Sequence, residues 1–351
     1  MIKWAEAGLL VTLGLHLLAC SKGAPPKNAT ESAQPAASPA PASPVAPAEA
    51  PTAETTTPTS TTGRGVKTEM HNVLFHLTED ASAHLETLSG EIWPVGKFEM
   101  PTFGDKNSFE VRVTRGRISI TPEALSSIMN EYVFAAKDAP LKELSVTIDK
   151  GRLKIKGKMP SKGDIPFETA GTVSVTPDGR LRVHTEKVKA LHVPVKGVMG
   201  VLGIELASVL NTSKIDGLDT EKNDLLMDLS QLLPPPHIRG KVTGVKVERN
   251  AIITIFGDGE KSAPASKETG NYMVFLGNPV RFGKLTMENA DITVLDLDPG
   301  DPLDWNQDHY KDQLVAGYSK ITPSFGLRAY VKDFAKLSRV SASGTSSVPA
   351  N

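Results

Sequence analysis

Apolar and polar residues alternate with a period of two through the region 67–337, and this period restricts the fold more than any other feature. Side chains at every second position of a strand face the same side, so the pattern predicts strands with one dry and one wet face. Three of these stretches surround short turns: 144–155 around Asp149-Lys150-Gly151, 173–183 around Pro177-Asp178-Gly179, and 245–255 around Arg249-Asn250. Such turns between alternating segments predict antiparallel hairpins.

Three segments have a helical pattern. Thr121-Pro122-Glu123 is typical of a helix start, with a capping threonine and a proline in the first turn. The apolar residues that follow share one helix face: Leu125, Ile128, Met129, Tyr132 and Val133. A leucine-rich helix is predicted at about 221–233, ending at Pro234-Pro235-Pro236.

The segment 198–210 is apolar nearly all round, which predicts a helix surrounded by protein or lipid. Thirteen residues in a helix rise about 20 Å, too little to cross a bilayer. Three interpretations remain: a core helix, a helix wrapped by a curved sheet that leaves an apolar groove, or a segment inserted into a membrane surface. The sequence as a whole predicts an α+β fold, in which a long antiparallel, curved β-sheet wraps around one or two apolar helices, with additional C-terminal β strands.

The N-terminal residues 1–20 have the features of an export signal: Lys3, then an apolar run that is too short for a bilayer span. The run ends in Leu17-Leu18-Ala19-Cys20, which resembles the lipobox of bacterial lipoproteins. That resemblance implies cleavage before Cys20 and acylation of its thiol, and several acyl chains anchor a protein firmly. Ser21 follows in place of aspartate, which by the sorting habit of enterobacterial lipoproteins implies an outer-membrane location facing the periplasm.

Residues 21–66 are rich in Pro, Ala, Ser and Thr and contain no aromatic residue, which is typical of a disordered linker. As a coil, its ends lie about 37 Å apart. The domains that follow are predicted as a sheet and helices over 67–257, a polar loop over 258–270, a β-rich lobe over 271–337 and a flexible tail over 338–351. One continuous fold and two abutting lobes are both compatible with this pattern.

The region between Phe109 and Gly257 has a recognisable order of elements. It contains the strand Arg117-Ile118-Ser119-Ile120 before the first helix, the glycine-turn hairpins, and Leu232-Leu233-Pro234 before a last hairpin ending in Ile255-Phe256-Gly257. This order resembles the LmeA-like phospholipid-binding family, which is related to tubular lipid-binding folds. It implies antiparallel strands around a helix, with lipid in an apolar tube. The chain departs from the family pattern in the separate helix predicted near Glu221 and in about 80 further residues.

The sequence contains no catalytic pattern that we could identify: no G-x-S-x-G elbow, no H-E-x-x-H and no phosphate-binding lysine loop. We therefore expect no enzymatic activity and no cofactor. A single cysteine excludes an internal disulfide. The acidic loop with Asp296, Asp298, Asp301, Asp304 and Asp308 offers calcium-type ligands, but its spacing does not fit an EF-hand, and we interpret these residues as turn and cap formers. No metal site is predicted, with Asp296, Asp298 and Asp301 as weak calcium candidates.

The chain carries 39 Lys+Arg against 40 Asp+Glu, which argues against nucleic acid as a partner. We expect a membrane-anchored envelope lipoprotein that non-covalently binds or transfers lipid or another apolar ligand. The predicted apolar lining is Leu125, Ile128, Met129, Tyr132, Val198, Val201, Leu202, Leu206, Val209 and Leu210. Strand residues Lys150, Arg152, Lys154 and Lys156 are predicted to face a phospholipid headgroup, or else to form a solvated sheet face. The alternative is a structural or assembly protein that binds another envelope protein.

Overall fold

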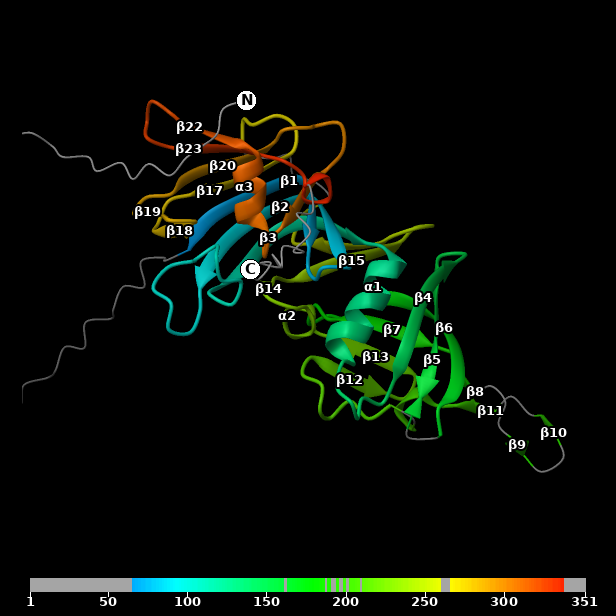
Figure 1. The fold of residues 1–351 in the computed structure, drawn as a ribbon. Helices are drawn as coiled ribbons and strands as arrows, with labels where there is room; N and C mark the ends of the chain where they lie inside the picture. Colours follow the sequence, from blue (N-terminus) through cyan, green and yellow to red (C-terminus); the bar gives the residue numbers. More distant parts are fainter. Residues whose placement is uncertain are drawn as a thin grey trace, which may run out of the picture. The chain divides into compact units, whose positions relative to one another are not determined.

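The computed structural model describes residues 65–337 apart from 161–162, 187, 191–193, 196–197, 200–201, 209 and 260–265, and gives only the backbone at 190, 194–195, 198–199, 202–204 and 208. The described residues belong to one compact unit, Ser60–Asn351 (Figure 1). The predicted signal peptide with Cys20, nearly all of the linker and the tail lie outside them, as do Val201 and Val209. These predictions therefore stay predictions.

Strands dominate the described chain, as the alternation predicts, and two sheets contain most of them. The large sheet has the order β15-β16-β3-β2-β1-β17-β20-β23-β22, with β14 pairing β3 and β21 pairing β1. Its strands are β1 (Val66–His76), β2 (Ser82–Pro94), β3 (Phe109–Ile120), β14 (His237–Arg239), β15 (Val242–Val247), β16 (Ile252–Phe256), β17 (Tyr272–Leu276), β20 (Asp291–Asp296), β21 (Leu303–Asn306), β22 (Tyr318–Ile321) and β23 (Leu327–Val331).

The small sheet has the order β11-β8-β6-β7-β13-β12, and β5 pairs with both β4 and β6. Its strands are β4 (Lys142–Asp149), β5 (Arg152–Met159), β6 (Ile165–Val175), β7 (Leu181–Thr185), β8 (Val188–Ala190), β11 (Leu202–Ile204), β12 (Leu218–Glu221) and β13 (Asp224–Met227). Two further pairs are β9 (Pro194–Val195) with β10 (Val198–Met199), and β18 (Val280–Phe282) with β19 (Leu285–Met287).

The three predicted hairpins are confirmed as the antiparallel pairs β4–β5, β6–β7 and β15–β16. Their turns contain residues that tolerate positive φ: Gly151 has φ 74° and Gly179 has φ 87°. The alternation therefore pins the register, because a shift by one residue would expose the apolar face of each strand.

The large sheet contains strands from both sides of the polar loop 258–270. The strand β17 lies between β1 and β20, with Met70 opposite Met273 and Phe275 opposite Ile292. The C-terminal strands β20 and β23 are parallel, as are β1 and β21. Residues from the start and the end of the described chain thus share one hydrogen-bonded sheet.

The helical elements are short. They are α1 (Pro122–Ile128), which continues as the π-helix Met129–Val133, α2 (Leu229–Leu232), α3 (Tyr310–Ala316), and the 3-10 turns Leu206–Ser208 and Phe334–Lys336. The helix start predicted at Thr121 is confirmed: its side chain accepts a hydrogen bond from Ala124 N at 3.1 Å, and Pro122 occupies the first turn.

The helix predicted over 198–210 is wrong. This segment forms β10, β11 and one 3-10 turn, and Leu202 pairs with Ala190. Its glycines at positions 200 and 203 and its β-branched valines lower helix propensity. A short run that is apolar on all sides does not distinguish helix from strand. Val198 and Leu202 are therefore strand residues.

The helix predicted over 221–233 is also wrong for most of its length. Lys222 adopts φ 53° in the turn that joins β12 to β13, and only Leu229–Leu232 is helical. The leucines that suggested one helical face belong to two elements. Leu225 packs in a strand, and Leu232 lies in α2, whose capping residue Asp228 accepts from Ser230 N.

Two main clusters of buried apolar residues form the core. The first cluster belongs to the large sheet and includes Ile128, Trp305 and Phe275. The second cluster belongs mainly to the small sheet and includes Phe134, Leu206, Leu210 and Leu232. The π-helix joins α1 to the second cluster, and Figure 1 shows α1 beside β4 and β5.

Candidate apolar ligand cleft

A cleft of about 530 Å³ opens where the π-helix ends, a volume within the range of roughly 300 to 1,000 Å³ typical of ligand pockets. Its walls combine apolar and polar side chains from the π-helix, the loop after it, the loop before β12, and α2. The lining residues are Tyr132, Val133, Ala136, Asp138, Ala139, Pro140, Asn211, Lys214, Ile215, Asp216, Gln231 and Leu232.

The π-helix forms one wall of the cleft. The amide of Phe134 donates to Met129 O at 2.8 Å, five residues back, so the last turn is wider than an α-helical turn. Tyr132 of this turn lines the cleft, whereas Phe134, directly after it, is buried in the second cluster. Isolated π-turns are rare and often occur at functional sites, which directs attention to this end of the helix.

Two polar side chains fix the helix against the edge strand β4. Asn130 donates from Nδ2 to Leu144 O at 2.7 Å and accepts from Leu144 N at 2.8 Å, while Ser126 Oγ accepts from Val146 N at 2.8 Å. These side chains satisfy backbone groups that a neighbouring strand would otherwise pair. The position of the π-turn, and hence of this cleft wall, is thereby fixed.

The opposite wall is the loop 211–216, in which Asn211 Oδ1 accepts from Ser213 N at 3.0 Å and Thr212 O accepts from Ile215 N at 2.9 Å. Lys214 from this loop lies 2.8 Å from Asp138 of the other wall. The hydrogen bond from Lys214 lowers the pKa of Asp138. Both side chains are exposed, so the ion pair is weak.

The structure brings only part of the predicted lining to this cleft. Tyr132 lines it, whereas Leu125 and Met129 pack on the second cluster, Leu206 and Leu210 are buried in it, and Ile128 is buried in the first cluster. The cleft residues that the sequence did not suggest lie in loops, where no periodic pattern marks them. The segment Asp138-Ala139-Pro140, a turn-type sequence with small apolar residues, is the one local signal.

The predicted headgroup-facing residues are mostly paired with acids. Arg152 lies 2.7 Å from Glu186, Lys154 lies 2.8 Å from Asp149, and Lys156 lies 3.6 Å from Glu168. The hydrogen bond to Asp149 raises the pKa of Lys154. Lys150 occupies the turn with φ 53° and is exposed. Three of the four predicted headgroup-facing residues are therefore in ion pairs and do not form a free cationic surface.

The apolar voids found beside the large sheet are too small for a hydrocarbon chain. Two apolar voids, bordered by Met70, Phe75 and Pro236 among others, measure about 20 Å³ each. A single water requires roughly 10 to 15 Å³, so each void is about the size of one water. Another cleft of about 560 Å³ lies on this sheet, and most of its lining residues are of charged or polar types, among them Lys67, Glu69, Arg115 and Lys267.

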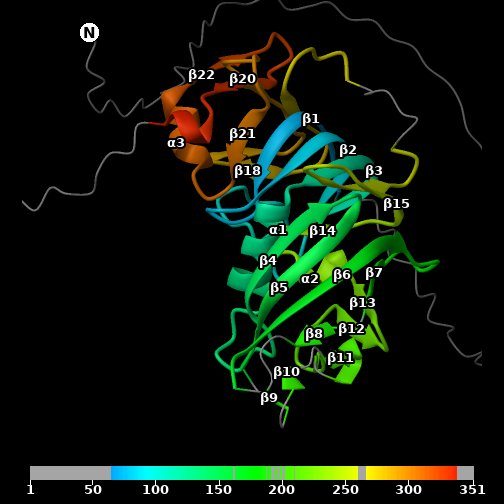
Figure 2. The same cartoon turned by 90° about the vertical axis from the view of Figure 1, so that its right-hand side faces the viewer.

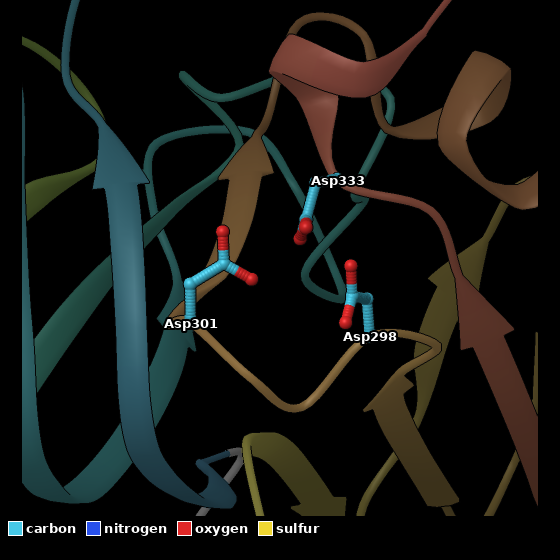
Figure 3. Close-up of side chains that lie close together, drawn as sticks. All are labelled: Asp298, Asp301 and Asp333. Carbon is cyan, nitrogen blue, oxygen red and sulfur yellow. The ribbon is translucent and has the colours of Figure 1, made fainter.

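Two aspartates of the acidic loop, both weak calcium candidates, lie beside a third aspartate that follows β23. Asp298, Asp301 and Asp333 offer oxygens within 4.8 Å of one another (Figure 3). Lys336 places its Nζ 2.7 Å from Asp298, 3.1 Å from Asp301 and 2.8 Å from Asp333. This lysine lowers the pKa of Asp298, and its own pKa is raised in return. The chain itself therefore supplies one cation to the three carboxylates and offsets part of their negative charge.

The third calcium candidate, Asp296, lies outside that cluster. It accepts hydrogen bonds from Asn271 Nδ2 and Asp298 N, both at 2.8 Å, and burial raises the pKa of its carboxyl. These bonds fit the interpretation of the loop aspartates as turn formers.

A histidine at the end of β1 should make stability depend on pH. His76 Nε2 lies 2.7 Å from Asp304 Oδ1; burial opposes protonation, but the hydrogen bond and charge of Asp304 raise the pKa of His76 above its ordinary value. The folded chain then binds this proton more tightly than the unfolded chain. The resulting stability is fully present below about pH 6.5 and is lost as pH rises through the folded-state pKa.

We therefore expect the free energy of unfolding lost in His76→Gln to be larger at pH 6 than at pH 8, as measured by urea denaturation. Burial lowers the pKa of His84, which gives the opposite slope, but His84 is present in both proteins and cancels in the difference. A difference that stays constant or grows with pH contradicts the assignment.

Comparisons of the chain with protein-family models, curated proteins and solved structures found no match. Among the described residues, none of the helices has the length and apolar character needed to cross a membrane.

Proposed function

We propose that this chain is a lipid-anchored envelope protein that holds an apolar or amphipathic ligand, such as a phospholipid, non-covalently in the cleft at the π-turn. The observation that carries the proposal is the cleft itself: about 530 Å³, open to solvent, with Val133, Ala139 and Leu232 among its apolar lining. An aliphatic chain placed there would gain roughly 25 cal/mol for each Å² of apolar surface removed from water.

The polar groups at the cleft suit an amphipathic ligand. Lys214 and Asp138 meet across two loops, and Tyr132 and Gln231 add a hydroxyl and an amide. A ligand that separates the ion pair would place an acidic headgroup oxygen near the Lys214 ammonium, while its apolar part contacts Ile215 and Pro140. In this proposal the curved small sheet wraps around α1 and holds the π-turn at the opening of the cleft.

The rest of the proposal concerns location. Acylation at Cys20 would attach the chain to the outer membrane on its periplasmic side, and residues 21–66 would let the unit reach ligands in or near that membrane. No reaction is part of this function, since binding and release are enough for storage or transfer.

The test is to produce the chain from Ser21 with a cleavable signal peptide, purify it without detergent, extract it with organic solvent and identify the released molecules by mass spectrometry. We expect lipid near one equivalent per chain, and displacement of a fluorescent fatty acid by the extract. A chain that yields no lipid and does not bind the fluorescent fatty acid contradicts the proposal and favours the assembly role.

A further inference from the structure

Exposed apolar side chains are concentrated at one edge of the large sheet. Within eleven residues, Val315 is 85% exposed, Tyr318 47%, Ile321 63% and Phe325 83%. Three of them belong to the hairpin Tyr318–Val331, which β22 and β23 form and which we call the edge hairpin. Its strand β22 lies at one end of the strand order of the large sheet (Figure 2). Each of its four residues is exposed. Side chains scattered singly need no explanation, but a cluster on one hairpin marks an interaction surface.

The hairpin tip holds its aromatic residue in an unfavourable backbone conformation. Phe325 has φ 64°, in a turn closed by hydrogen bonds from Phe325 N to Thr322 O and from Thr322 N to Gly326 O. A bulky residue in this region is an outlier that folding alone does not favour, and this ring has little protein contact to offset the cost. The exposed ring at the tip therefore points to a contact outside the chain.

The charges of the edge hairpin are basic. Its charged residues are Lys320 and Arg328, and Lys320 Nζ lies 5.4 Å from the ring centres of both Tyr318 and Tyr330. At its base Arg328 pairs with Glu268, and the carboxylate of Asp291 lies against Gly326. Aromatic rings with a lysine among them, beside exposed aliphatic groups, are typical of segments that lie at a membrane interface.

We propose that the edge hairpin inserts Phe325 and Ile321 into the surface of an anionic bilayer and so holds the folded unit against the membrane. Pairing of β22 with another strand is a poorer explanation, because Lys320 in the middle of this short strand and Pro323 after it are features that prevent edge pairing. The proposal rests on the anchored part of the proposed function: a coil of about 37 Å keeps the hairpin near lipid, so that weak insertion suffices.

The test uses the full-length acylated chain in vesicles of phosphatidylethanolamine and phosphatidylglycerol. Ser324→Cys places a thiol beside Phe325, and it is the one reactive thiol if Cys20 is acylated. Labelled with an environment-sensitive fluorophore, it should show a blue-shifted emission and at least fivefold more quenching by brominated lipids than the same label at Thr286→Cys. That control position lies on the β18–β19 hairpin beside the exposed Leu285.

Replacing both Phe325 and Ile321 with Ser in the labelled chain should remove most of the quenching, whereas Leu285→Ser should leave it unchanged. Equal quenching at positions 324 and 286, no quenching at 324, or self-quenching between chains without lipid quenching overturns the proposal. Labelling of Cys20 in the unaltered chain shows instead that the anchor is missing. The Cys20→Ser form is then held on vesicles that contain a nickel-chelating lipid by a histidine tag at its N-terminus, so that quenching at 324 supports insertion and its absence overturns it.

Discussion

Replacing Ala136 with Trp is expected to empty the cleft while the fold remains intact. Ala136 lines the cleft and is exposed, so an indole at this position extends into the cleft without displacing core residues. If the indole excludes about 100 Å² of ligand surface, the loss of roughly 2.5 kcal/mol corresponds to about 50- to 100-fold weaker binding. Titration with a fluorescent fatty acid and mass spectrometry of the co-purified lipid would both measure it.

The neighbouring Ala135 provides the matched control. It is also exposed but does not line the cleft, so Ala135→Trp makes the same chemical change on the adjacent surface. We expect this variant to bind like the unaltered chain, and both variants to keep their circular dichroism spectrum and melting temperature. Equal loss in both variants, or full retention by Ala136→Trp, would place the ligand elsewhere or remove it altogether.

The largest loss of stability is expected for Trp305→Ala. Trp305 is fully buried at 0% exposure in β21, where it packs beside Tyr310 and donates from Nε1 to Gln307 Oε1 at 3.0 Å. Its removal leaves a cavity in the first cluster and an amide acceptor without its donor. Such substitutions cost about 3 to 5 kcal/mol, which urea denaturation followed by circular dichroism would detect.

Trp93→Ala is the control for that change. Trp93 is partly exposed on β2, stacks under the Arg112 guanidinium at 4.2 Å and donates to Glu91 Oε2. Because the Trp93 ring is only partly removed from water, we expect Trp93→Ala to lower the free energy of unfolding by less than half as much as Trp305→Ala. Equal losses would mean that the first cluster tolerates the cavity by rearrangement.

The sequence predicted the elements that local chemistry determines. The hairpins around Gly151 and Gly179 follow from alternation joined to a turn residue, and the helix start follows from the cap at Thr121 and from Pro122. The helix prediction over 198–210 was wrong because a continuous apolar run has no period that favours helix or strand. The pairing of its strands determines its structure instead. Local propensities do not predict which strands will pair.

The candidate site was the least predictable part. Tyr132 appeared in the helical pattern, but Ile215 and Lys214 are separated from it by about 80 residues and lie in a loop without periodicity. The pairing of β13 with β7 and of β12 with β13 determines where the loop before β12 and the helix α2 lie. Because the walls meet only through this non-local pairing, spacing along the chain carried no sign of the cleft.

The pairing of β1 with β17 has a consequence for how the protein acquires its structure. Met70 pairs with Met273, so β1 and β17 can join in the middle of the large sheet only after some 200 further residues have been synthesised. Contacts between such distant residues make folding slow, because loop closure must precede any gain. If the chain is exported, as we propose, this late closure keeps the large sheet open while the chain crosses the membrane, and loss of the last two strands, β22 and β23, would leave β20 with a bare edge.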